Sequence, residues 1–219
     1  MNWKRIPKEN SIAPTYGLYS DWKPLLSVEG FHQCVYCTIS EGSFGGIRNF
    51  HVEHYRPKAL DEFKELENDY TNLFYSCSIC NSFKSDDWPN HPDNTFNKAY
   101  YPDPSKVDYT QLFQVFEDSG LIAGQNYTGT YILNKLYLNR PQLIINRREN
   151  LTELKYQELI TNIQVQKKKL FSLIELGNKD ALDLLKELDK RVVSLEQTYH
   201  EKEKTIPYAD NQVKRQPLN

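Results

Sequence analysis

Four cysteines form two C-x-x-C pairs, and a stretch rich in histidine lies between the pairs. The pairs are Cys34/Cys37 and Cys77/Cys80, and the stretch is HVEHYRPKAL at residues 51–60. Each pair can supply two thiolates from one tight turn, and structural Zn²⁺ takes four such ligands in a tetrahedron. In a reducing compartment this spacing favours a metal ion over disulfides. We therefore predict one structural zinc site, with a redox role for one pair as the alternative.

The residues between and just after the cysteine pairs can bind a second, harder cation. Mg²⁺ and similar ions prefer carboxylate and amide oxygens, and Glu53 and the side chain of Asn81 offer one group each. A neutral imidazole can take a proton from water near pH 7. His54 beside such a cation would therefore generate a hydroxide-like nucleophile that attacks phosphorus.

His51 lies on the same short segment and has no single interpretation. If residues 51–54 form a strand, His51 and Glu53 point to one side, and His54 points to the other. His51 is then either an additional ligand or substrate contact, or a structural hydrogen-bonding group.

The order of these blocks resembles the zinc-bearing branch of the HNH endonucleases. The blocks are CVYC, EHYRP, YTNLFYSC and SICNSFK, and the resemblance covers roughly residues 31–88. It implies an α+β fold with a ββα-metal core and a structural four-cysteine zinc site. It also implies hydrolysis of phosphodiester bonds in DNA, with Mg²⁺ or Mn²⁺ as the catalytic cation.

The resemblance assigns roles position by position. Glu53 matches the acidic metal ligand, His54 matches the general base, and Asn72 matches the middle asparagine that holds the loop geometry. Asn81 matches the last motif position, which is His in some members and Asn in others, so the cation's second ligand is less defined than its first. Basic residues beside the motif are expected to contact nucleic acid: Arg56, Lys58 and Lys84.

Three of these residues also have a purely structural interpretation. Glu53 could pair only with Arg56 or Lys58, and Asn72 could simply cap a turn. Asn81 follows a cysteine pair at a point where a helix should begin, so it could serve as a helix cap.

Two other functions fit parts of the pattern. HVE followed by CSIC matches the H-x-E…P-C-x-x-C signature of zinc deaminases, in which His51 would bind a catalytic zinc and Glu53 would move protons. Ser76 stands where that signature has proline, and the first cysteine pair would have no use. The non-enzymatic alternative is a zinc-organised module that binds nucleic acid or protein. The presence of both Glu53 and His54 favours an enzyme over that module.

The elements that must position these residues follow from composition and periodicity. Residues 1–30 predict loops with short helices that pack on the core, and residues 31–90 carry the motif. Residues 91–127 predict an irregular connection and a hairpin, residues 128–200 a helical extension, and residues 201–219 a tail.

The helical extension predicts an antiparallel hairpin. Pro141 can begin a helix that runs to about residue 175, and Gly177 can end it. Asn178 or Asp180 can cap a second helix. Two helices alone cannot cover the apolar stripe, so we expect the hairpin to dock on the cysteine-bearing part, on a second copy of the chain or on another protein.

The segment after the core loosely resembles HNH proteins of bacterial anti-phage defence systems such as Septu. The resemblance rests on tyrosine- and proline-rich sequence followed by TYILNKLYLNRPQLIINRRE. It implies antiviral defence and a possible ATPase partner.

Charge and hydropathy exclude other classes. The chain has 219 residues and a formal net charge of −2. General polyanion binders carry an excess of Lys and Arg, so any DNA contact must be local. No stretch approaches the roughly 18 consecutive apolar residues of a membrane span, and no apolar run of a secretory signal follows the N-terminus. We therefore expect a cytoplasmic protein that has no membrane partner.

Overall fold

The computed structural model describes residues 3–8 and 13–204, and the chain separates into two compact units. The first is Met1–Glu153 and the second is Leu154–Asn219. The division falls inside one long helix, whereas the sequence suggested a change of organisation at residue 128. The first unit therefore includes the N-terminal segment, the motif and the start of the helical extension.

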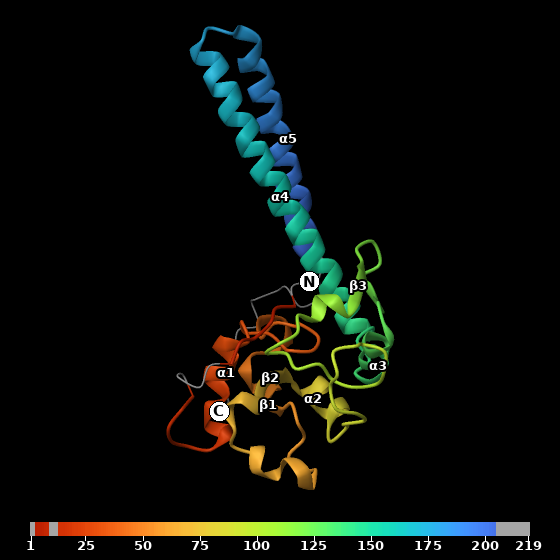
Figure 1. Cartoon of the computed structure of the whole chain (residues 1–219). Coiled ribbons are helices and arrows are strands. Elements are labelled where there is room, and N and C mark those ends of the chain that lie inside the picture. Colours follow the sequence, from red (N-terminus) through yellow and green to blue (C-terminus); the bar gives the residue numbers. More distant parts are fainter. Residues whose placement is uncertain (1–2, 9–12, 205–219) are drawn as a thin grey trace, which may run out of the picture. The chain divides into compact units, whose positions relative to one another are not determined.

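Two antiparallel strands and a short helix form the centre of the first unit (Figure 1). Strand β1 (Phe50–His54) pairs with β2 (Leu73–Cys77), and α2 (Ser78–Lys84) follows β2 without a loop. The register places Phe50 opposite Cys77 and His54 opposite Leu73. The predicted α+β class and its ββα core are confirmed.

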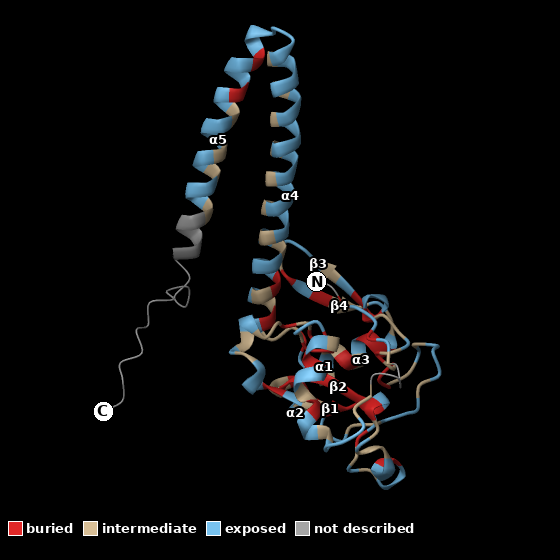
Figure 2. Cartoon of the chain, turned by 90° about the vertical axis from the view of Figure 1, so that its left-hand side faces the viewer, coloured by how far each residue is buried: buried red, intermediate tan, exposed pale blue. Residues whose placement is uncertain are grey.

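An aromatic core supports this ββα core, and Figure 2 shows both strands among the buried parts of the unit. Phe50 and Tyr75 stack across the two strands with ring centroids 4.6 Å apart. From the N-terminal segment, α1 (Lys23–Glu29) contributes Leu26, and the indole of Trp3 donates a 2.8 Å hydrogen bond to the Tyr36 carbonyl. The N-terminal residues thus pack on the motif, as predicted. Short 3₁₀ helices connect these elements at Tyr19–Trp22, Gly42–Phe44, Ile47–Asn49, Asp61–Leu66, Tyr70–Asn72 and Tyr109–Gln111.

The predicted hairpin after the irregular connection is confirmed. Strands β3 (Phe113–Phe116) and β4 (Leu121–Gly124) pair antiparallel, and Gly120 adopts φ +71° in the turn between them. The next helix, α3 (Tyr127–Lys135), begins one residue before the expected start of the helical extension at residue 128, and the side chain of Asn126 caps its N-terminus.

Two long helices follow, α4 (Pro141–Glu175) and α5 (Lys179–Lys204). Gly177 adopts φ +84° between them, and the Asn178 side chain accepts a hydrogen bond from the backbone N–H of Asp180. Within the second unit, the two helices lie antiparallel. Helix α5 continues four residues into the range expected to be tail, and the rest of that range lies outside the described residues. None of the described helices is both long enough and apolar enough to span a membrane.

Candidate metal centre and active site

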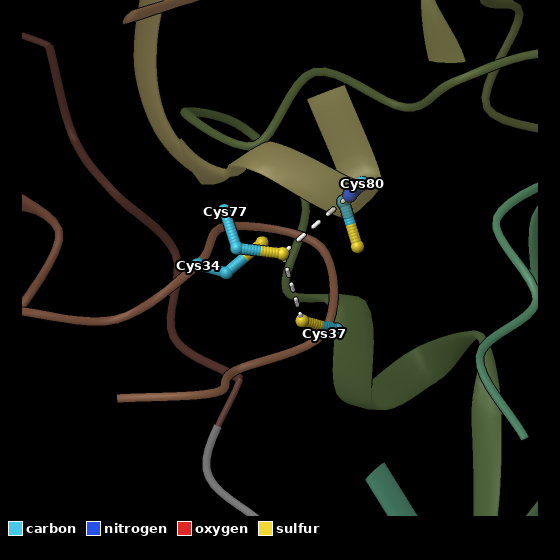
Figure 3. Close-up of side chains that lie close together, drawn as sticks. All are labelled: Cys34, Cys37, Cys77 and Cys80. Carbon is cyan, nitrogen blue, oxygen red and sulfur yellow. Dashed lines mark hydrogen bonds between the residues drawn. The ribbon is translucent and has the colours of Figure 1, made fainter. Parts of the chain in front are cut away.

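The four cysteine sulfur atoms gather at one buried point (Figure 3). All four Sγ atoms lie within 4.8 Å of one another, and every cysteine is at most 2% exposed. Cys34 and Cys37 lie in the loop before β1, whereas Cys77 ends β2 and Cys80 lies in α2. The predicted grouping is confirmed.

Backbone hydrogen bonds shape the two turns that present the thiols. In the first, the N–H of Thr38 donates to the Cys34 carbonyl over 2.9 Å, and Thr38 adopts φ +58°. The N–H of Val35 donates to the Tyr75 carbonyl over 2.9 Å, which attaches this turn to β2. In the second, the Cys77 sulfur accepts from the N–H of Cys80 over 3.5 Å and caps α2.

The donor set fits structural zinc. Four sulfur ligands from two separate turns complete a closed tetrahedral site and leave no position for a substrate or a water molecule. All four thiols lie in the hydrophobic core, where thiolates need a cation to offset the loss of solvation. The cluster therefore suits a fold-stabilising ion.

A cleft with a volume of about 530 Å³ lies beside β1 and α2. Its lining includes His51, Glu53 and His54 from β1, Asn81 from α2, and Lys58 from the loop after β1. The structure thus brings five of the expected residues to one cavity. Asn72, Arg56 and Lys84 do not line it.

The Glu53 carboxylate is held at the inner wall of the cleft by two donors that share one oxygen. Oε1 lies 2.7 Å from the Lys84 ammonium and accepts a 3.1 Å hydrogen bond from the Tyr36 hydroxyl. Burial raises the pKa of Glu53, while Lys84 and the Tyr36 hydroxyl act in the opposite direction. Both contacts are made by Oε1, and Oε2 takes part in neither of them.

Lys84 does not match its predicted role. Its side chain is fully buried, and besides Glu53 its ammonium donates a 3.0 Å hydrogen bond to the His54 carbonyl and lies 5.4 Å from the ring centre of Tyr101. A lysine is rarely buried without a partner, and here the partner is the acidic residue of the motif. The expectation that Lys84 contacts nucleic acid is wrong, because its ammonium is enclosed in the core.

The His54 imidazole is oriented by a backbone carbonyl. Its Nε2 lies 3.0 Å from the carbonyl oxygen of Glu67, and its ring meets the Tyr19 ring edge-on at 4.7 Å between centroids. A carbonyl oxygen can only accept, so Nε2 carries the proton and Nδ1 keeps its lone pair in the neutral ring. Burial lowers the pKa of His54, which favours this neutral form at pH 7.

Asn72 joins the two segments that enclose His54. Its side-chain oxygen accepts from the N–H of Arg56 over 2.8 Å, and its amide nitrogen donates to the carbonyls of Arg56 and Leu66 over 3.0 and 3.4 Å. Leu66 directly precedes Glu67, whose carbonyl orients the imidazole. Asn72 is therefore a buried positioning residue, which agrees with the loop-holding role that the sequence suggested.

Asn81 and His51 line the cleft, and no side-chain hydrogen bond joins either of them to another described residue. Asn81 is the fourth residue of α2, and Cys77 provides the helix cap, so the alternative in which Asn81 caps the helix is wrong. His51 is exposed on β1 opposite Ser76. It is not part of the cysteine cluster, which removes the ligand set required by the deaminase hypothesis.

Arg56 and Lys58 lie at different places. Lys58 lines the cleft, pairs with the Glu67 carboxylate over 2.5 Å and donates to the Tyr19 hydroxyl over 2.8 Å. Arg56 is exposed but lines a separate cavity with Asp69 and other residues. Neither residue forms an ion pair with Glu53, whose partner is Lys84. The alternative in which Glu53 pairs only with Arg56 or Lys58 is therefore wrong.

Sequence reasoning missed three contributors to the site. Tyr36 lies between the first two cysteines, and its hydroxyl is 3.1 Å from Glu53. Glu67 acts on His54 through its backbone, and Tyr19 packs on the imidazole from the N-terminal segment. Tyr36 could have been suspected from the sequence because it lies inside the first C-x-x-C pair. The Glu67 contact could not, because it uses a backbone carbonyl that every residue type has.

Comparison with known proteins gives one result for this region. Residues 34–87 match a family model described as HNH endonuclease. The matched segment contains all four cysteines, both strands of the central pair and α2. No curated protein and no solved structure matches the chain.

Proposed function

Because residues 34–87 form an HNH endonuclease domain, we propose that the protein is a metal-dependent endonuclease that hydrolyses phosphodiester bonds in DNA. The observation that carries this proposal is the cleft that collects Glu53, His54 and Asn81 around one cavity. A carboxylate, an amide and an imidazole are the groups required to bind a hard cation and activate water beside it.

Glu53 and Asn81 would hold the catalytic cation, Mg²⁺ or Mn²⁺. The ion would supply Lewis acidity and neutralise charge on the phosphate. The contacts of Lys84 and Tyr36 with Oε1 support a fixed carboxylate whose other oxygen is available. With one carboxylate and one amide, most remaining ligands would be water and phosphate oxygens, as is common for Mg²⁺.

His54 would be the general base. With its Nε2–H donating a hydrogen bond to the Glu67 carbonyl, the free Nδ1 lone pair would take a proton from water. The water oxygen would then bond to phosphorus as the P–O bond to one strand end breaks, and the leaving oxygen would take up a proton from solvent. Asn72 would preserve this orientation because it fixes the Leu66 carbonyl, one residue from the one that holds the ring.

Lys58 is the better candidate for a phosphate contact than Arg56, because Lys58 lines the cleft. Its ammonium already pairs with Glu67 and Tyr19, so phosphate would replace or join those partners. The zinc-binding cysteines would have a structural role, since four protein ligands close the coordination sphere.

Antiviral defence in the cytoplasm is the setting that we propose from the resemblance to Septu-type proteins. An ATPase or a second copy of the chain would bind the α4–α5 hairpin. Apolar side chains exposed on these helices, including Leu159, Phe171 and Leu184, support a docking role.

A plasmid cleavage assay tests the proposed function. Supercoiled DNA would be incubated with zinc-loaded protein and Mg²⁺ or Mn²⁺, with and without a candidate ATPase. A matched sample would receive EDTA, with its zinc content measured afterwards so that loss of structural zinc is not mistaken for loss of the catalytic cation. Nicked or linear product that requires the added cation is expected. If DNA binds without product under every condition, the second candidate, a zinc-organised binding module, replaces the enzyme.

A further inference from the structure

A guanidinium lies against the cysteine cluster. Arg140, between α3 and α4, places Nη2 3.7 Å from the sulfur atoms of Cys37 and Cys77 and 3.6 Å from that of Cys80. These distances are in the range of N–H···S hydrogen bonds, and one nitrogen reaches three of the four thiols. Arg140 lies well beyond the segment that matches the HNH family.

The rest of the Arg140 side chain is anchored to the end of α3. Its Nη1 donates to the carbonyls of Leu136 and Tyr137 over 3.1 and 3.4 Å. The Arg140 Nε–H is buried and has no partner among the described residues. No ion pair of Arg140 with a carboxylate is found in the described part of the chain, so the groups there that would carry negative charge beside it are the cysteine sulfurs with zinc bound.

The charge of the zinc site explains why a cation is useful at this point. Four thiolates around Zn²⁺ leave a net charge of −2. In a buried site water does not solvate this charge, so a nearby cation stabilises it. Donors in the outer shell of a metal site reduce charge on the ligands and fix their orientation. Arg140 supplies a positive charge and hydrogen-bond donors together.

We propose that Arg140 is an outer-shell residue of the zinc site. Its guanidinium donates to the metal-bound thiolates, slows loss of the ion and lowers the reactivity of the sulfurs. Because Arg140 is fixed to α3, zinc binding also fastens the segment from β3 to the start of α4 onto the HNH domain.

Arg147 offers a matched control. It is a second arginine from the same segment, 2% exposed, and its guanidinium donates to the carbonyls of Gly120 and Leu138 and to the side-chain oxygen of Asn139. No hydrogen bond from Arg147 to a cysteine sulfur is found among the described residues. Replacing Arg147 with methionine removes a buried guanidinium from the same part of the fold without removing an N–H···S bond.

The experiment compares Arg140→Met, Arg140→Lys and Arg147→Met in the full-length protein. The first readout is the rate at which a chromogenic chelator removes zinc from folded protein, and the second is the rate of cysteine alkylation by iodoacetamide. The third is the sulfur-to-metal charge-transfer band of Co²⁺-substituted protein, which responds to hydrogen bonds on the thiolates. Neither the cation at the cleft nor nuclease activity enters any of these measurements.

We expect Arg140→Met to weaken metal retention by about 10- to 100-fold, as for other outer-shell residues. It should also speed alkylation and shift the Co²⁺ band. Arg140→Lys should recover part of each effect, and it remains informative if the methionine variant does not fold. Arg147→Met should lower stability while leaving the band in place. Equal zinc loss from Arg140→Met and the wild type, or equal acceleration and the same band shift in Arg147→Met, would overturn the proposal.

Discussion

Replacing Lys84 with methionine should destabilise the first unit severely. The Lys84 and Glu53 side chains are 0% and 3% exposed, and their charged atoms are 2.7 Å apart. Removing one member of a buried ion pair costs about 3–5 kcal/mol, because the other charge stays buried without its counterion. The methionine variant leaves Glu53 with the Tyr36 hydroxyl alone, and the His54 carbonyl also loses a donor.

Urea unfolding of zinc-loaded protein measures this cost. The control is Lys64→Met, because Lys64 pairs with Asp61 at the surface, where both side chains are more than half exposed. The control should leave the free energy of unfolding nearly unchanged. A double variant, Glu53→Gln with Lys84→Met, should recover much of the loss because no buried charge is left unpaired.

The size of the effect decides whether the core pair exists in solution. A loss under about 1 kcal/mol for Lys84→Met, similar to an ordinary surface substitution, would refute the buried pair. A full-sized loss with no recovery in the double variant would mean that Lys84 stabilises the fold through contacts other than Glu53. Either result would show that the ion pair with Lys84 does not fix the position of the Glu53 carboxylate.

Three further outcomes are expected. Asn72→Ala should cost about 1–3 kcal/mol, because buried backbone groups lose their partners, and should slow cleavage at saturating substrate; unchanged unfolding would contradict the role of Asn72. Burial raises the pKa of Glu41, but hydrogen bonds from Ser27 and Tyr75 outweigh this and hold the pKa below its usual 4.5; stability from Glu41 is thus present above pH 4.5 and is lost as pH falls through the folded-state pKa. Glu41→Gln should flatten that part of the acid unfolding curve, and an unchanged curve would count against it. Tyr137→Gly should raise the melting temperature, because Tyr137 has φ +47° at the end of α3 and relief of a left-handed backbone is worth roughly 1 kcal/mol; a lower melting temperature would show that the tyrosine ring contributes more than the strain costs.

Features that depend on local chemistry could be predicted from the sequence. Each C-x-x-C pair forms its own local turn, so each half of the cysteine cluster could be predicted from neighbouring residues. The fold then brings the two halves together. Gly120 and Gly177 mark turns because their positive φ values suit glycine, and Asn178 caps a helix with its own side chain. Such signals act over a few residues and are visible in residue type.

Features that depend on packing could not be predicted in the same way. Lys84 was expected to contact nucleic acid because it is a basic residue beside the motif, but the fold places it next to Glu53 and buries both side chains. The orientation of His54 rests on the backbone of Glu67, and Arg140 reaches the cysteines from a distant segment. The residue types alone did not specify these long-range neighbours.

The most direct test of the central claim is cation-dependent DNA cleavage by His54→Ala compared with the wild type. Both proteins would be matched for zinc content, secondary structure and DNA affinity, and assayed under single-turnover conditions with Mg²⁺ or Mn²⁺. A general base contributes about 10²- to 10⁴-fold to a rate, so the variant should cleave slower by that factor while it still binds DNA. Cleavage by His54→Ala at the wild-type rate would contradict the assignment of His54 as the base in this cleft.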